Sequence, residues 1–210
     1  MKKILLATLA SISFTFAVQA QFKVGIIGGG SRVSQRVNSK GAEALYSNDH
    51  FKTYHAGFIA DMPVTERISL QPKLLYSQKG STLLSATGSA DARVRMKTIE
   101  LPVTVVYKFP VSFGKLFGGA GAGFSYALSG QQTQNGQQKN LYKDLSGWRR
   151  EDISYHLSAG VEFNNGLFAS ISSQKSLLDA YKPDGVSVKN RSTSVSLGYL
   201  INWNAFKRKR

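Results

Sequence analysis

His156 and Ser158 come closest, in type and spacing, to a catalytic pair. Residues two apart in a β-strand point to the same face, so the histidine could accept the proton of the serine. Glu162 has the same parity and could orient the histidine. Their shared face is polar and is expected to point into the protein, where polar pairs are common. We therefore expect a structural role for both residues, and an enzyme using His156 and Ser158 is the least favoured function.

Metal-binding side chains are scattered along the chain. His50, His55 and His156 lie far apart, and the sequence has no cysteine. Glu151 and Asp152 are adjacent, so in a strand they would point to opposite faces and could not act as a pair. The sequence therefore predicts no metal ion and no cofactor.

Apolar and polar side chains alternate through most of the chain. The clearest example begins at Ile68, where one parity is apolar as far as Tyr76 while the other parity is mostly polar. Such alternation indicates a strand with two different faces. The same pattern occurs at 54–62, 68–77, 98–108, 153–163 and 194–203, and more weakly at 22–28, 116–128 and 167–173. Together these segments predict eight strands.

The links between the predicted strands alternate between short and long. Short links fall at 63–66, 110–114 and 164–166, and the last carries the Asn-Gly pair of a tight hairpin. Long polar links fall at 31–50, 81–93, 129–150 and 178–190. This rhythm predicts an all-β fold: an eight-stranded antiparallel transmembrane β-barrel with short periplasmic turns, four longer external loops and both termini in the periplasm. A soluble barrel with an apolar interior is the alternative, but aromatic residues at the ends of the apolar faces favour the membrane barrel.

The first residues have the pattern of a secretory signal. Lys2 and Lys3 precede an apolar stretch, and Ala20 provides a small residue at the exit. We predict a signal peptide at 1–20, an outer-membrane barrel at 21–206 and a basic C-terminal tail at 207–210.

The chain is strongly basic. Its formal net charge of +15 falls to +13 when the two lysines of the predicted signal leave with it. Such a charge would suit nucleic acid inside a cell, but export argues against that partner. Outer-membrane lipids with anionic headgroups, or polysaccharide phosphates, are better candidates. A generally basic surface with no chosen partner is the alternative.

Two motifs resemble a known family. The segment 68–80, ISLQPKLLYSQKG, resembles the third-strand motif of PorT-like outer-membrane β-barrel proteins, and 99–103, IELPV, is similar to their next strand. Glycines at 118–123 and the segment 160–163 match later strands less specifically. The resemblance implies an eight-stranded barrel in the outer membrane of a Gram-negative bacterium, with no catalytic motif. Some family members are tied to protein secretion and gliding. One departure is the basic tail that follows Phe206, since such barrels often end on an aromatic residue.

Ionisable residues on the polar faces are expected to line the lumen. The predicted network consists of Arg67, Lys73, Glu100, Lys108, His156 and Glu162. We expect Glu100 and Glu162 to pair with basic residues such as Arg67 and Lys73. An eight-stranded barrel is just wide enough for its own side chains to fill it, so this network should close the lumen. A small-solute channel is the alternative.

The long link at 129–150 carries the best candidate contact surface. It is rich in glutamine and then becomes basic and aromatic, at Lys139, Tyr142, Lys143, Trp148, Arg149 and Arg150. Arginine can bind phosphate or carboxylate in a bidentate way, and aromatic rings supply rigid contact area. We expect a non-enzymatic barrel with a structural or partner-binding role, whose partner is an anionic glycan or an envelope protein. A solvated loop with no partner is the alternative.

Overall fold

The computed structural model describes residues 22–39, 46–49, 51–85, 92–134, 136–145, 147–180 and 186–203. The predicted signal peptide at 1–20 and the predicted tail at 207–210 lie outside these ranges. Within them, no helix is long and apolar enough to cross a membrane.

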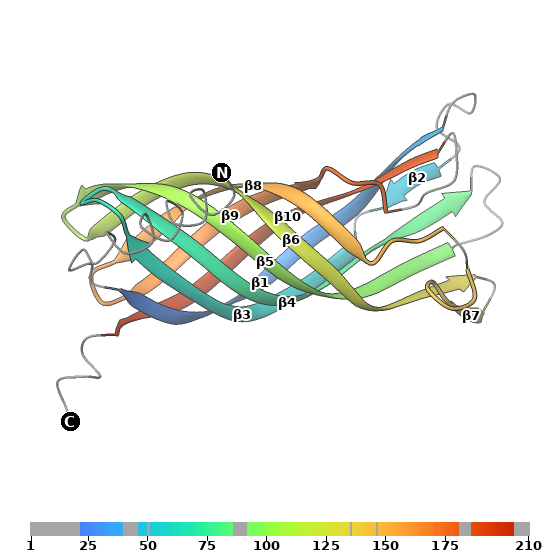
Figure 1. Ribbon diagram of the computed structural model, residues 1–210, viewed down its shortest axis with the longest axis horizontal. Coiled ribbons are helices and arrows are strands. Elements are labelled where there is room, and N and C mark those ends of the chain that lie inside the picture. Colours follow the sequence, from blue (N-terminus) through green and yellow to red (C-terminus); the bar gives the residue numbers. More distant parts are fainter. Residues whose placement is uncertain are drawn as a thin grey trace, which may run out of the picture.

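Eight long antiparallel strands form a closed barrel (Figure 1). They are β1 (Lys23–Ser39), β3 (Phe51–Pro63), β4 (Ile68–Ser85), β5 (Ala92–Val111), β6 (Gly114–Gln134), β8 (Glu151–Phe163), β9 (Leu167–Ser176) and β10 (Val186–Asn202). Each pairs with the next along the chain, β1 pairs with β10, and the ring is thereby complete. Two short strands, β2 (Tyr46–Asp49) and β7 (Gln137–Asn140), add to β4 and β6. The predicted fold is confirmed.

The barrel is apolar outside and largely polar inside. On β5, Leu101 and Val105 are exposed, whereas Glu100, Thr104 and Lys108 are buried. The other strands follow the same alternation, because successive side chains of a strand point to opposite faces. The parity predicted from the sequence is therefore confirmed on the long strands.

The two ends of the barrel differ. Residues 64–67, 112–113 and 164–166 form tight turns at one end, which we call the short-turn end and where β1 begins and β10 finishes. Gly166 has a φ of 90°, as the predicted Asn-Gly turn requires. The opposite, long-loop end carries β2 and β7 (Figure 1). Here the strands extend further than predicted: β1 runs to Ser39 and β6 to Gln134, within segments expected to be loops.

Glycines on the inner face allow the small barrel to curve. A Cβ built on Gly121 would lie 2.0 Å from the carbonyl oxygen of Val103 on the neighbouring strand, and one on Gly57 would lie 2.0 Å from that of Leu74. No side chain fits at such distances. These positions therefore require glycine because of close backbone approach.

Candidate functional site: the lumen and its outer mouth

The short-turn end of the lumen is closed by ion pairs. Lys108 Nζ donates to Asp61 Oδ2 at 2.7 Å and to Glu162 Oε2 at 2.9 Å, and Lys23 Nζ donates to Glu162 Oε1 at 2.6 Å. The amide of Gln71 donates to Asp61 Oδ1 at 3.0 Å. We call these residues the inner ion cluster. Two lysines balance two carboxylates, which offsets the cost of burying the charges.

Apolar side chains fill a part of the lumen separate from the inner ion cluster. Ile27, Ile59, Phe168 and Leu200 form a buried cluster, with Leu75 packed against it. These residues come from strands β1, β3, β9, β10 and β4. The cluster thus brings together side chains from more than half of the ring, and it obstructs a continuous water path.

Two histidines line a small polar cavity of about 50 Å³. His55 is hydrogen-bonded to Ser31 Oγ and Ser196 Oγ, each at 2.8 Å, and His156 Nε2 lies 3.0 Å from Ser154 Oγ. A volume of this size holds a few water molecules. The cavity is therefore too small to be the passage of a general porin.

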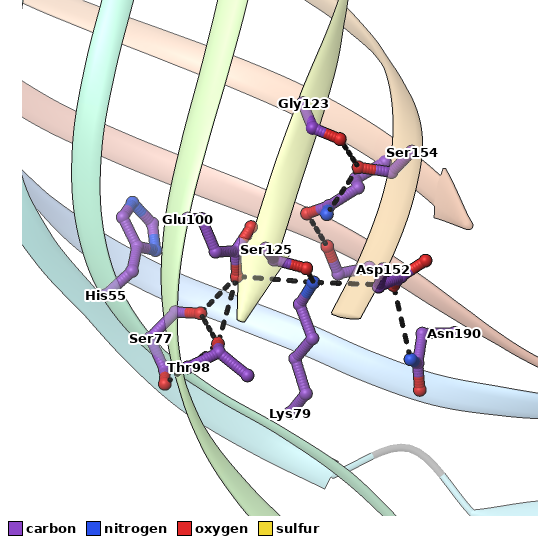
Figure 2. Close-up of polar contacts among 12 residues, drawn as sticks. His55, Ser77, Lys79, Thr98, Glu100, Gly123, Ser125, Asp152, Ser154 and Asn190 are labelled. Carbon is purple, nitrogen blue, oxygen red and sulfur yellow. Dashed lines mark hydrogen bonds and ion pairs between the residues drawn. The ribbon is translucent and has the colours of Figure 1, made fainter. Parts of the chain in front are cut away.

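A second ion cluster lies toward the long-loop end (Figure 2). Lys79 Nζ is 3.5 Å from Glu100 Oε1, 3.9 Å from Asp152 Oδ2 and 3.1 Å from Ser125 Oγ. Glu100 also accepts hydrogen bonds from Ser77 and Thr98. All six side chains are buried. This outer ion cluster joins β4, β5, β6 and β8 across the lumen.

Residues after β7 pack against the inner face of β5 at the long-loop end. Leu141 is fully buried with Val94 and Met96 of β5, and Tyr142, Leu145 and Trp148 pack against them. We call residues 141–145 and 147–150 the lid. The guanidinium of Arg150 lies 4.3 Å from the centre of the Tyr142 ring and donates to the carbonyl oxygen of Ala127 at 3.2 Å. Burial raises the pKa of the Tyr142 phenol to about 12.

The structure places five of the six predicted lumen residues in the ion clusters or beside the cavity: Lys73, Glu100, Lys108, His156 and Glu162. Lys73 lines the cavity, but among the described residues it forms no ion pair. The prediction for Arg67 is wrong. This residue lies in the 64–67 turn, fully outside the lumen, where it donates to Tyr107 Oη at 3.2 Å. Arg67 lies one residue before β4 begins, so strand parity does not determine where its side chain points.

The partners of the two predicted glutamates were missed. Glu162 pairs with Lys23 and Lys108, and Glu100 pairs with Lys79, so neither predicted partner, Arg67 or Lys73, is used. Asp61 and Asp152 complete the clusters. The parity of Asp61 and Lys79 placed both on the polar face, and this signal could have identified them.

The predicted contact surface divides into two parts. Lys139 and Lys143 are exposed, whereas Tyr142, Trp148, Arg149 and Arg150 are half-buried in or beside the lid. The backbone N–H of Arg149 donates to Ala180 at 3.0 Å. The aromatic rings therefore hold the lid on the barrel, and only the two lysines are fully available to a partner.

The possible catalytic pair is not aligned as a triad. His156 Nε2 contacts Ser154 Oγ, while Ser158 Oγ is buried without a hydrogen-bond partner among the described residues. Glu162 is bound to the two lysines of the inner ion cluster. In the part of the chain that the structure describes, no group of three metal-ligating side chains is present.

Comparison with known proteins gives one family. The model of the outer membrane protein beta-barrel domain matches residues 8–182. No curated protein sequence matches significantly. Among solved structures, the chain is similar to Ail, the attachment invasion locus protein of Yersinia pestis, with 15% identity over 85% of this chain and 98% of that one and a TM-score of 0.44. It is also similar to Neisserial surface protein A, with 13% identity over 85% of this chain and 96% of that one and a TM-score of 0.48. For OprG from Pseudomonas aeruginosa the identity is 11% over 86% of this chain and 96% of that one, and the TM-score is 0.47.

Proposed function

Because the chain belongs to the outer membrane protein beta-barrel domain family and lies in the outer membrane, we propose that it is a non-enzymatic barrel that binds a partner at its long-loop end. Loops on a rigid scaffold are where binding functions are usually found. The filled lumen supports this proposal over a channel, since two ion clusters and an apolar cluster occupy it.

The observation that carries the proposal is a polar hollow on the β6–β7 hairpin. It has a volume of about 210 Å³ and is lined by Gln132, Gln134, Gln137 and Lys139. Gln132 is opposite Lys139, and Gln134 is opposite Gln137, so the four residues share one part of the hairpin. Amides offer both donors and acceptors to sugar hydroxyls, and the ammonium group offers a partner to an anionic substituent. We infer that the hollow takes an anionic glycan.

A closer kinship with PorT-like proteins is part of this proposal. This kinship rests on the motifs at 68–80 and 99–103. It would connect the protein to secretion, and its partner would then be an envelope protein. The enzyme alternative receives less support, since the His156 ring forms its hydrogen bond with Ser154 and not with Ser158.

Binding of heparin oligosaccharides to the purified full chain in detergent micelles tests the proposal, with neutral chito-oligosaccharides of equal length as the comparison. We expect the heparin probe to bind and Lys139→Glu to weaken it at least tenfold. Arg67→Glu is the matched control, because it reverses an exposed charge at the opposite end of the barrel. Equal binding by both variants would contradict the proposal. Crosslinking in intact outer membranes would then show whether an envelope protein is the partner.

A further inference from the structure

Basic side chains mark the outer boundary of the apolar belt on four adjacent strands. On β3, β1, β10 and β9 the outward-facing residues are apolar or small as far as Tyr54, Gly30, Val195 and Ile171. One or two outward positions further toward the long-loop end, each strand carries a basic residue. These are Lys52, Arg32, Arg191 and Lys175, which we call the cationic arc.

The cationic arc is arranged as two pairs of like charge. Arg32 lies directly opposite Lys52 across β1 and β3, and Arg191 lies directly opposite Lys175 across β10 and β9. Directly opposed like charges destabilise a sheet unless an anion lies between them. Lys175 is also held near the Tyr155 ring, with its Nζ 5.8 Å from the ring centre.

Acidic residues are missing from this surface. The four strands together contain one carboxylate, Asp61, and it faces the lumen, where it binds Lys108. The next strand, β8, carries the exposed Glu151 just beyond Ile153 and ends the basic stretch. No carboxylate in the described parts of these four strands faces outward beside the arc, so an anion of the surrounding membrane can balance its charge.

The height of the arc identifies that molecule. The apolar belt of an outer-membrane barrel matches the hydrocarbon of the bilayer, so the first charged residues beyond it lie among the lipid headgroups. The long-loop end of such a barrel faces outward, and the arc therefore meets the outer leaflet. Strands are spaced about 4.8 Å apart, and Arg32 lies opposite Thr193, two residues from Arg191. The centres of the two pairs are therefore roughly 10 Å apart across the sheet and about 7 Å apart along the strands. Two separate phosphates on one headgroup would match two separate cation pairs.

We propose that the cationic arc is a binding site for a glycolipid of the outer leaflet whose headgroup carries two phosphates, one for each pair. Lysine and arginine form strong charge-assisted hydrogen bonds with phosphate oxygens. The site does not involve the β6–β7 hairpin, so it stands apart from the glycan-binding proposal.

Native mass spectrometry of the full chain, released from micelles with added lipid, tests the site. The probes are diphosphoryl lipid A, monophosphoryl lipid A and phosphatidylglycerol. We expect the diphosphoryl lipid to be retained at least tenfold better than the other two. Each double variant, Arg32→Gln with Lys52→Gln and Arg191→Gln with Lys175→Gln, should lose about tenfold in retention, since each basic residue near a membrane surface contributes appreciably to anionic-lipid binding.

Arg93→Gln with Lys97→Gln is the matched control, because these exposed β5 residues lie beyond the belt on the far side of the ring and do not oppose another cation. This variant should keep the preference for the diphosphoryl lipid. Equal retention of the three lipids would overturn the proposal, and so would an equal loss in the control and in the arc variants. A gel shift on boiling verifies that each variant is folded.

Discussion

Lys108 and Glu162 meet across the lumen from strands that are not neighbours in the sheet, with 2.9 Å between Nζ and Oε2. Lys108 also binds Asp61 at 2.7 Å, so one ammonium group serves two buried carboxylates. The contact ties the ring together through its interior as well as through its strand ladders.

Replacing this ammonium group should destabilise the barrel strongly. Lys108→Met leaves Asp61 without a cation and Glu162 with Lys23 alone, and breaking a buried pair in this way costs about 3–5 kcal/mol. Denaturant unfolding of protein inserted in lipid vesicles measures the change. Lys97→Met, on the same strand but exposed, should have an effect below about 0.5 kcal/mol. The role of the inner ion cluster would be refuted by equal losses in the two variants.

A second prediction concerns the space that Gly123 leaves for the His156 ring. A Cβ on Gly123 would lie 2.6 Å from His156 Nε2, so Gly123→Ala must displace the ring from Ser154. Overpacking of this kind costs about 1–3 kcal/mol. Gly118→Ala on the same strand is the control, since its Cβ would approach only the Ser158 carbonyl at 4.0 Å.

Adding His156→Ala to Gly123→Ala should recover part of the loss, because the two groups compete for the same space. Unfolding free energies of the two single variants and the double variant give the coupling. If the losses in unfolding free energy were strictly additive, Gly123 would not be needed to make room for the His156 ring.

The strands could be predicted from the sequence wherever one face is apolar and the other polar. The end of β1, which continues to Ser39, could not be predicted, because its two faces are mostly polar. Ladder hydrogen bonds to β10 hold these residues in the strand, and such bonds leave no periodic signal in the sequence. Arg67 was misplaced for a related reason. Parity assigns a face only while the chain is a strand, and at Arg67 the chain is still in a turn.

The lumen residues could be predicted more readily than their partners. Parity placed Glu100 and Lys73 inside, but it does not give the height of a residue in the barrel. That height depends on the register between all the strands, and the register brings Lys79 to Glu100 and leaves Lys73 beside the cavity. A single sequence contains no direct record of these distances.

The lid should open when its anchor is shortened. Leu141→Ala removes a fully buried side chain from the cluster with Val94 and Met96, a change that costs about 2–5 kcal/mol. Because the lid lies at the long-loop end, we expect faster hydrogen exchange of residues 137–150 while β3 and β9 stay protected. Lys143→Ala removes an exposed lid side chain and should leave the exchange unchanged. Slowed or unaltered exchange in Leu141→Ala would contradict the packing described.

The lid should also respond to alkaline pH through Tyr142. Burial is the main cause that raises the pKa of this phenol to about 12, while the charge of Arg150 acts in the opposite direction. A raised pKa means that the stabilising contribution is complete below the unfolded value near 10 and is lost as the pH rises through 12. Near-ultraviolet absorption should show one late tyrosine titration that Tyr142→Phe removes. If the two proteins titrate alike, the phenol is not buried in solution.

Planar-bilayer conductance of the purified full chain tests the closed lumen most directly. Two ion clusters, the Ile27–Ile59–Phe168–Leu200 cluster and a cavity of only about 50 Å³ predict no steady opening of porin size in the wild-type protein. Steady porin-sized openings from the folded protein would contradict closure and would restore the small-solute channel as its function.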